Sequence, residues 1–255
     1  MDVKFDFSGK NFLVVGASSG MGREIAKELA AAGAHVLAVA RNMERLCELR
    51  DENSERIDVA VKDVTVSTVA DWDELLASYV EKHGKLSGMV YTAGTSYATP
   101  LRFFDYDRAR EVMETGFWGA VKVLQSCTKK RYVHKGSSYV VFSSTAANAA
   151  EKGLAVYAAA KSAVVVGMKS FAHDLAKDGH RINTISPGYV DTGMTQNART
   201  DMGDPVGVIE RHLFGIGKPE NVAGMVLFLM SNCSSWITGA NFIVDGGYLL
   251  GGNKA

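Results

Sequence analysis

Residues 12–22 read FLVVGASSGMG, and this stretch decides the fold. Four apolar residues at its start predict a buried strand, and apolar side chains at helical spacing over 21–32 predict the helix that follows. Between these elements, glycines let the backbone turn sharply and come close to a ligand. Because the free N–H groups and the positive dipole end of a helix start hold phosphate well, the stretch predicts a dinucleotide-binding turn. The alternative is an ordinary glycine-rich turn without a ligand.

The rest of the chain continues this alternation of short apolar runs and longer helical patterns. Further strands are expected at 35–40, 57–61, 86–92, 138–142, 181–186 and 241–244, and further helices at 43–49, 67–83, 105–132, 154–177 and 221–230. Repeated strand–helix–strand units with apolar strands predict a parallel sheet covered on both faces. No linker or repeat divides the chain. We therefore expect a single doubly wound α/β domain of Rossmann type over 1–255, with a seven-stranded parallel sheet.

The composition excludes several classes of protein. Of the 255 residues, 47% are hydrophobic and 22% are charged, which excludes an intrinsically disordered chain. The 28 basic and 28 acidic residues balance, so neither nucleic acid nor an anionic membrane is expected as a partner. Cys47, Cys127 and Cys233 form no C-x-x-C pair and the six histidines show no ligand spacing, so no disulfide framework or metal site is expected. Residues 1–10 lack the apolar core of a signal peptide, and we expect a cytoplasmic protein.

The end of the second expected strand predicts which dinucleotide is bound. A carboxylate at this place binds the ribose hydroxyls of NAD, but this sequence carries Arg41 followed by Asn42. A guanidinium pairs with a 2′-phosphate and stacks on adenine. The sequence therefore favours NADP(H). The alternative is a surface arginine at the start of the next helix.

Tyr157 is the one tyrosine among nine that is followed by a lysine four residues later, Lys161. The alanines between them predict a helix, which places both side chains on one face. A lysine ammonium lowers the pKa of a nearby phenol and prepares it to act as general acid or base. Ser144 lies at the end of the fifth expected strand, where open α/β sheets bind ligands, and its hydroxyl would orient a substrate oxygen. Ser143 is its rival for this role.

Together, these residues resemble the short-chain dehydrogenase/reductase family, in its compact branch with 3-oxoacyl-reductase-like members. The resemblance covers nearly the whole chain, and its further motifs are Asn183, Thr238-Gly239 and Asp245-Gly246-Gly247. It implies an oxidoreductase that transfers a hydride between NADP(H) and a carbonyl or alcohol. It also implies that Tyr157 is the acid/base, that Lys161 lowers its pKa and binds the nicotinamide ribose, and that Ser144 orients the substrate.

The same resemblance implies the cofactor-binding residues. The glycine turn would hold the pyrophosphate, Asp63 and Val64 would contact adenine, and Val190 and Thr192 would contact the nicotinamide carboxamide. The full expected set is Gly16, Ser18, Ser19, Gly20, Met21, Gly22, Arg41, Asn42, Asp63, Val64, Ala93, Gly94, Tyr157, Lys161, Pro187, Gly188, Val190 and Thr192. The resemblance further implies a homotetramer, with the long helices pairing, and a substrate lid over 192–215.

Three positions depart from the family pattern. Val15 stands where the family usually has Thr, and Tyr91-Thr92 stands where it has Asn-Asn. Gly116 stands where the family has an Asn that is thought to hold a water in the proton relay behind the lysine. Gly116 offers no amide. The alternative function is therefore a catalytically weak or inactive dinucleotide-sensing or scaffold protein.

The sequence leaves the substrate open among a 3-oxoacyl thioester, a sugar or polyol, and a cyclic or steroid ketone. Asp178 at the end of the Tyr157 helix disfavours docking of an acidic acyl carrier protein. The methionines of the expected lid predict a partly apolar pocket, with Tyr97 and Tyr189 as candidate walls. Enoyl reduction is disfavoured because the relatives that perform it space the tyrosine and lysine more widely. A sugar epimerase of the extended branch is disfavoured because the chain is too short for the added substrate domain.

Overall fold

The computed structural model describes residues 3–149, 151–193, 195 and 211–251. Within these ranges seven strands form one sheet in the order β3-β2-β1-β4-β5-β6-β7, and each neighbouring pair is parallel. This confirms the doubly wound sheet expected from the sequence. The strands are β1 (Asn11–Val15), β2 (His35–Ala40), β3 (Ile57–Val61), β4 (Leu86–Tyr91), β5 (Val133–Phe142), β6 (Arg181–Pro187) and β7 (Asn241–Val244).

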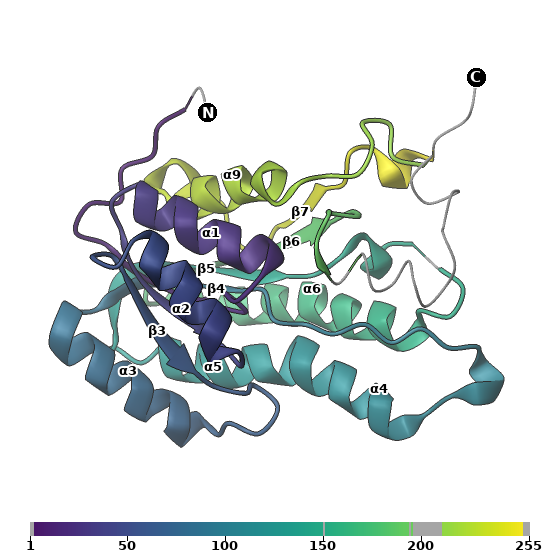
Figure 1. The fold of residues 1–255 in the computed structure, drawn as a ribbon, viewed down its shortest axis with the longest axis horizontal. Helices are drawn as coiled ribbons and strands as arrows, with labels where there is room; N and C mark the ends of the chain where they lie inside the picture. The colour runs from purple at the N-terminus through teal and green to yellow at the C-terminus, as the bar shows by residue number, and fades with distance from the viewer. Residues whose placement is uncertain (1–2, 150, 194, 196–210, 252–255) are drawn as a thin grey trace.

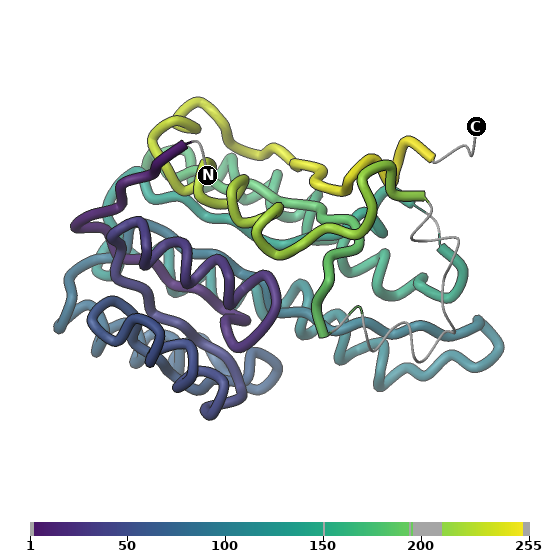
Figure 2. The backbone as a smooth tube through the Cα atoms, turned by 45° about the horizontal axis from the view of Figure 1, so that its top comes forward, coloured from purple at the N-terminus to yellow at the C-terminus, as the bar shows by residue number. Residues whose placement is uncertain are grey.

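Helices cover both faces of the sheet (Figure 1). On one face lie α1 (Gly20–Ala31), α2 (Met43–Glu52) and α9 (Pro219–Met230). On the other lie α3 (Val69–His83), α4 (Tyr106–Met113), α5 (Gly119–Cys127) and α6 (Ala155–Ala176). Figure 2 shows early and late parts of the chain side by side, where α1 packs against α9. In the described part of the chain, no helix is long and apolar enough to cross a membrane.

Strand β1 shows why the strand sequences are continuous apolar runs. All five of its residues are buried. Phe12 and Val14 belong to the core cluster beneath α1 and α9, whereas Leu13 and Val15 belong to the cluster beneath α3, α5 and α6. Successive side chains of a strand point to opposite faces of the sheet. A strand covered on both faces is therefore apolar at every position.

The helical stretch expected over 105–132 is confirmed over 106–127, but it contains a π turn and it ends earlier than expected. It consists of α4, a π turn over Glu114–Trp118, and α5, which ends at Cys127. Residues 128–132 form a turn instead, and β5 begins at Val133, earlier than expected. The main-chain groups of this turn begin the pairing of β5 with β4, a long-range contact that helical spacing in the sequence does not register.

The parallel sheet brings the carboxyl ends of its strands to one edge. The order of strands reverses between β1 and β4, because the chain continues from β1 toward β3 on one side and from β4 toward β7 on the other. Open α/β sheets bind their ligands at such a reversal. The loops that follow β1, β4, β5 and β6 therefore meet where a ligand is expected.

Candidate active site

The turn after β1 is shaped by three glycines. Gly16 and Gly20 have φ values of 91° and 54°, a backbone region that side chains disfavour. A Cβ at Gly22 would lie 2.3 Å from the carbonyl oxygen of Gly16, so glycine alone fits there. Ser19 is the N-cap residue of α1, and no side chain of the described residues caps this helix end. The N–H groups of the first turn are thus left for a phosphate, and the turn fits the expected pyrophosphate.

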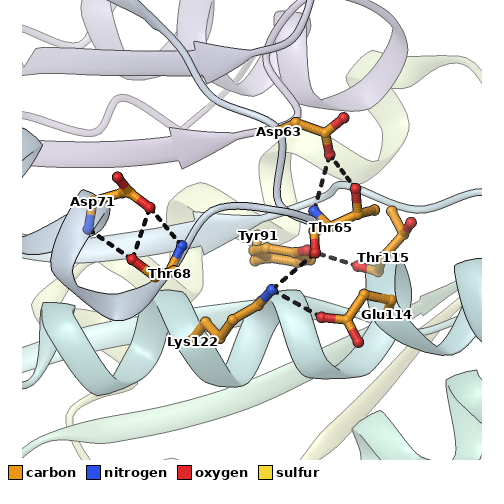
Figure 3. A network of polar contacts seen from close by, with 8 residues as sticks. All are labelled: Asp63, Thr65, Thr68, Asp71, Tyr91, Glu114, Thr115 and Lys122. Carbon is orange, nitrogen blue, oxygen red and sulfur yellow. Dashed lines mark hydrogen bonds and ion pairs between the residues drawn. The ribbon is translucent and has the colours of Figure 1, made fainter.

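Arg41 and Asp63 lie at the carboxyl ends of β2 and β3, on the same edge of the sheet. The Arg41 side chain is 72% exposed, and its guanidinium is 3.9 Å from the Asp63 carboxylate. Burial raises the pKa of Asp63, but hydrogen bonds from Thr65 (Figure 3) and the charge of Arg41 outweigh it and hold the pKa below its usual value. Asn42 caps α2 with its side chain, and Val64 is buried. The exposed guanidinium is accessible to a phosphate of the cofactor.

The loops after β4 and β6 come close to the same place. Ala93 and Gly94 follow β4, and a Cβ at Gly94 would lie 3.3 Å from Lys161 Nζ. Pro187 ends β6, and a Cβ at the next residue, Gly188, would lie 2.9 Å from the backbone that follows β7. Glycine at these two positions allows the loops to pack closely at the sheet edge.

The segment after Gly188 turns back toward the glycine turn. Val190 is buried, and a Cβ at Gly20 would lie 3.0 Å from the methyl carbon of Thr192. Met21 lies in the first turn of α1 and is partly buried against the core, and Ser18 is partly buried in the turn itself. The structure thus brings the Thr192 segment and the glycine turn together at one edge of the sheet.

Ser144, Tyr157 and Lys161 gather beside these loops. Ser144 follows β5, and its hydroxyl accepts a hydrogen bond from Ala146 N–H at 3.2 Å. Tyr157 and Lys161 lie in α6, and Lys161 Nζ is 5.7 Å from the centre of the Tyr157 ring. Lys161 is only 4% exposed and donates a hydrogen bond to the Phe142 carbonyl at 3.0 Å.

The structure separates the roles of the two neighbouring serines. Ser143 is buried, and its hydroxyl donates to the main-chain carbonyl of Lys161 at 2.8 Å. This bond fastens α6 to the end of β5. Ser144 lines a cavity together with Tyr157. Of the two, Ser144 is therefore the one placed to meet a substrate.

The charges of the site differ from the sequence expectation in one respect. Burial raises the pKa of Tyr157; the Ser144 side chain lowers it by hydrogen bonding, and Glu151 raises it further. Burial lowers the pKa of Lys161 to about 8. The Lys161 ammonium donates to the Phe142 carbonyl and lies 5.7 Å from the centre of the Tyr157 ring. Tyr157 is a neutral phenol at pH 7, a form that donates a proton.

A cavity of about 350 Å³ lies in front of Ser144 and Tyr157. Tyr97 and Tyr189 are among its walls, as the sequence predicts. The lining includes several hydroxyl groups. The lid methionines, from which a partly apolar pocket is expected, lie within residues 194 and 196–210, outside the described residues. In the described residues, no group of three or more His, Cys, Asp or Glu side chains could hold a metal ion.

Comparison with known proteins decides the family. A sequence profile described as Enoyl-(Acyl carrier protein) reductase matches residues 16–249. A solved structure of a short-chain type dehydrogenase/reductase from Mycobacterium ulcerans superposes with a TM-score of 0.88 at 28% identity, over 97% of this chain and 92% of that chain. The chain belongs to the short-chain dehydrogenase/reductase family.

Relatives in this short-chain dehydrogenase/reductase family carry several activities in their names. The chain is 30% identical to a 3-oxoacyl-(acyl-carrier-protein) reductase of Rickettsia conorii, over 96% of this chain and 99% of the relative. It is 28% identical to a tropinone reductase homolog of Arabidopsis thaliana, over 98% of this chain and 96% of the relative. The protein is thus an oxidoreductase of a family that uses nicotinamide dinucleotides.

Of the departures from the short-chain dehydrogenase/reductase pattern, Gly116 lies within the π turn, and Tyr91 contacts the same turn at Thr115 (Figure 3). The Tyr91 hydroxyl donates a hydrogen bond to the Thr115 carbonyl at 2.6 Å. A Cβ at Gly119 would lie 2.5 Å from this hydroxyl, so glycine at 119 leaves the room that Tyr91 occupies. A π turn disturbs the helical hydrogen bonds, and Tyr91 supplies a donor to one of its carbonyls. The Lys122 ammonium donates hydrogen bonds to the Glu114 carboxylate of the π turn and to the Thr65 carbonyl, in the loop that follows β3. Lys122 thereby connects the π turn to this loop.

Replacement of Tyr91 by Phe is expected to lower the free energy of unfolding by about 1–3 kcal/mol, because the part-buried Thr115 carbonyl loses its donor. Tyr91 is fully buried, so no water replaces the hydroxyl readily. Denaturant unfolding measures the change. Tyr106→Phe is the matched control, because that side chain is 72% exposed. Equal stability of the two variants would show that the hydroxyl does not hold the π turn.

Sequence reasoning missed two residues of this site. Glu151 lines the cavity with Tyr157, and Tyr248 donates a hydrogen bond to it from the far end of the chain. Glu151 lies in a loop without periodicity, and its partner is 97 residues away. A carboxylate six residues before the expected acid/base was the one available signal.

Proposed function

We propose that this protein transfers a hydride between NADP(H) and the carbonyl or alcohol carbon of a small molecule. The observation that carries the proposal is that Ser144 and Tyr157 line one cavity, while buried Lys161 lies one helical turn from Tyr157 in α6. The proposed unit is a single domain over 1–255, with 192–215 as its substrate lid. A ketone, aldehyde or alcohol is the partner in the reaction.

The residues divide the work of binding the cofactor, which when bound supplies or accepts the hydride. The first turn of α1 would hold the pyrophosphate, and Arg41 the 2′-phosphate. Asp63 and Val64 would border the adenine. Ala93, Gly94 and Lys161 would border the nicotinamide ribose, and Pro187, Gly188, Val190 and Thr192 the nicotinamide.

Two side chains, those of Tyr157 and Ser144, would act on the substrate oxygen. The Tyr157 hydroxyl would donate its proton to a carbonyl oxygen, and the Ser144 hydroxyl would hold the same oxygen by a hydrogen bond. The raised pKa of Tyr157 keeps the phenol protonated, which favours the direction of reduction near pH 7. Burial lowers the pKa of Lys161 to about 8, so its amine would be able to release and regain a proton next to Tyr157.

A self-association of the long helices is part of the proposal. A shallow surface beside α4 and α6 is lined by Phe104, Tyr106, Trp118 and Val156, and the Trp118 side chain is half-exposed. Burial of such apolar area on a second copy would stabilise a dimer or tetramer. Sedimentation equilibrium measures the mass in solution, and a monomer at micromolar concentration would contradict this part.

The wild-type protein provides the first test. Absorbance of NADPH should fall when the protein is given a panel of ketones. The alternative, a dinucleotide-sensing or scaffold protein, rests on Gly116 in place of the family's Asn. It predicts cofactor binding without turnover on every ketone of the panel.

Replacement of Gly116 by Asn separates a weak enzyme from an efficient one. A Cβ at Gly116 would meet the Ala160 methyl at 3.6 Å, an ordinary contact, so a Cβ is accommodated there. If the missing amide limits proton delivery to Lys161, kcat should rise on the order of tenfold. Gly116→Ala is the control, since it adds the Cβ without the amide. A kcat unchanged in both variants would mean that backbone groups and water already serve the relay.

A further inference from the structure

The carboxylate of Glu151 is a feature of the cavity that is not among the site residues expected from the family pattern. Glu151 lies between the short helix over Thr145–Ala147 and α6, and it lines the cavity together with Ser144 and Tyr157. It is partly exposed. A charged group that borders both expected substrate-binding hydroxyls is placed to contact the substrate itself.

Two tyrosine hydroxyls hold this carboxylate in place. Tyr248 donates to one oxygen at 2.5 Å, and Tyr189 donates to the other at 3.3 Å. Tyr189 follows β6, whereas Tyr248 follows β7. The two hydrogen bonds to Glu151, called the clamp below, therefore join the loops after β5, β6 and β7. Each carboxylate oxygen has more than one acceptor site. One hydrogen bond on each oxygen therefore fixes the orientation and leaves acceptor capacity toward the cavity.

The loop around Glu151 is also anchored on its other side. The carbonyl of Gly153 accepts a hydrogen bond from Thr99 N–H at 3.0 Å, and Gly153 has a φ of 83°. Thr99 belongs to the segment after β4 that supplies Tyr97 to the cavity wall. The carboxylate is thus a pre-organised group on a braced loop, which is how recognition groups gain selectivity at low entropic cost.

The charges near Glu151 do not neutralise it directly. Among the described residues, the charged side chains that line the cavity are Glu151, Glu111 and Arg108, and Arg108 lies 3.9 Å from Glu111. Arg211 stacks on the Tyr248 ring, with its guanidinium carbon 4.4 Å from the ring centre. The negative charge of Glu151 is close enough to raise the pKa of Tyr157. The other polar groups of the wall are neutral, chiefly hydroxyls of Thr95, Ser96 and Tyr97.

We propose that Glu151 selects substrates that carry a hydrogen-bond donor, a hydroxyl or an ammonium, next to the reacting carbonyl, and that it rejects carboxylate-bearing ketones. This inference rests on the proposed function and names its substrate class. A substrate with an apolar group next to its carbonyl cannot donate a hydrogen bond to the fixed Glu151 carboxylate, and the unpaired carboxylate lowers the affinity for that substrate. An anionic neighbour meets the repulsion of a like charge.

Four small ketones of similar size test this selectivity. Hydroxyacetone and aminoacetone carry the donor, butanone has a methyl group in its place, and pyruvate has a carboxylate in place of the whole hydroxymethyl group. The wild type with NADPH should show kcat/KM for hydroxyacetone about 10- to 100-fold above butanone, and pyruvate should be the poorest. A larger preference for aminoacetone than for hydroxyacetone would assign the natural donor as an ammonium, and the reverse would assign a hydroxyl.

Glu151→Gln is the decisive variant, because it keeps the shape and one acceptor oxygen but removes the charge. The preference for hydroxyacetone over butanone should fall about 10-fold, and pyruvate should improve relative to butanone. Tyr248→Phe is the control, since it loosens the clamp but keeps the carboxylate, and it should retain the order of the four ketones. Equal losses on all four ketones in Glu151→Gln, or no preference in the wild type, would overturn the inference.

A binding measurement keeps this inference separate from the proposed reaction. Calorimetry compares propylene glycol with its isostere secondary butanol on the protein loaded with NADP. Tighter binding of the diol, lost in Glu151→Gln, supports the recognition role even if no ketone is reduced, in which case the proposed reaction alone fails. Equal binding of the two alcohols to the wild type would overturn the role of Glu151.

Discussion

Tyr157→Phe should lower kcat for NADPH-dependent ketone reduction by about 10³-fold, the scale on which a positioned general acid contributes. The variant retains the ring in α6 and loses only the hydroxyl that shares the cavity with Ser144. Absorbance of NADPH at saturating ketone measures the rate. Ring packing is unchanged, so the fold should survive with a small loss of stability.

Two controls make this result specific for proton transfer. NADPH binding, followed by calorimetry, should stay within about threefold of the wild type, because the phenol contributes little to cofactor affinity compared with the phosphate contacts. Tyr189→Phe is the matched variant in the cavity wall, and it should keep most of the activity because its hydroxyl contacts Glu151 rather than Ser144. Full activity of Tyr157→Phe would refute the assignment of the acid/base.

Arg41→Ala should weaken NADPH binding by about 10- to 100-fold while NADH binding changes little, because a guanidinium–phosphate pair is a charge-assisted contact that NADH cannot make. The side chain is mostly exposed, and its one ion-pair neighbour is Asp63 at 3.9 Å. Loss of Arg41 also leaves Asp63 without that cation, and the carboxylate then repels a 2′-phosphate. Dissociation constants for both dinucleotides measure the change.

Arg50→Ala provides the control for general electrostatics. Arg50 lies in the last turn of α2, at the opposite end from Arg41, and pairs with Asp51. Its removal takes away the same charge without a contact at the cofactor edge, so both dinucleotides should bind as before. If Arg41→Ala weakens NADPH and NADH equally, then Arg41 does not read the phosphate and the preference for NADP(H) is wrong.

The sheet and most helices could be predicted because their signals are local. Every residue of β1 is buried on one face or the other, so the run at 12–15 is apolar without interruption. The glycine turn was equally readable, since the backbone requirement at Gly16, Gly20 and Gly22 admits no other residue. In these cases the physical constraint acts on the residue type itself.

The sequence prediction and the structure differ where the local structure makes contacts with a distant part of the chain. The π turn over Glu114–Trp118 accepts a hydrogen bond from the Tyr91 hydroxyl of β4, and the turn after α5 pairs with the start of β4 through the Tyr132 carbonyl. Pattern and propensity describe a residue's own neighbourhood, and they favour one long helix there. The same reason explains the clamp on Glu151, which joins loops after β5, β6 and β7.

The sequence by itself determined the parallel α/β sheet, the family and the residue types of the expected site, because apolar periodicity, obligatory glycines and the Tyr157–Lys161 spacing are written in the chain. Tertiary structure alone decided that Ser144 rather than Ser143 faces the cavity, since the Ser143 hydroxyl is taken by the Lys161 carbonyl. It also decided the charge state of the site. Burial raises the pKa of Tyr157, and the Lys161 ammonium is held by the Phe142 carbonyl. Burial and long-range hydrogen bonds exist only once the strands have assembled, and therefore no local pattern could supply them.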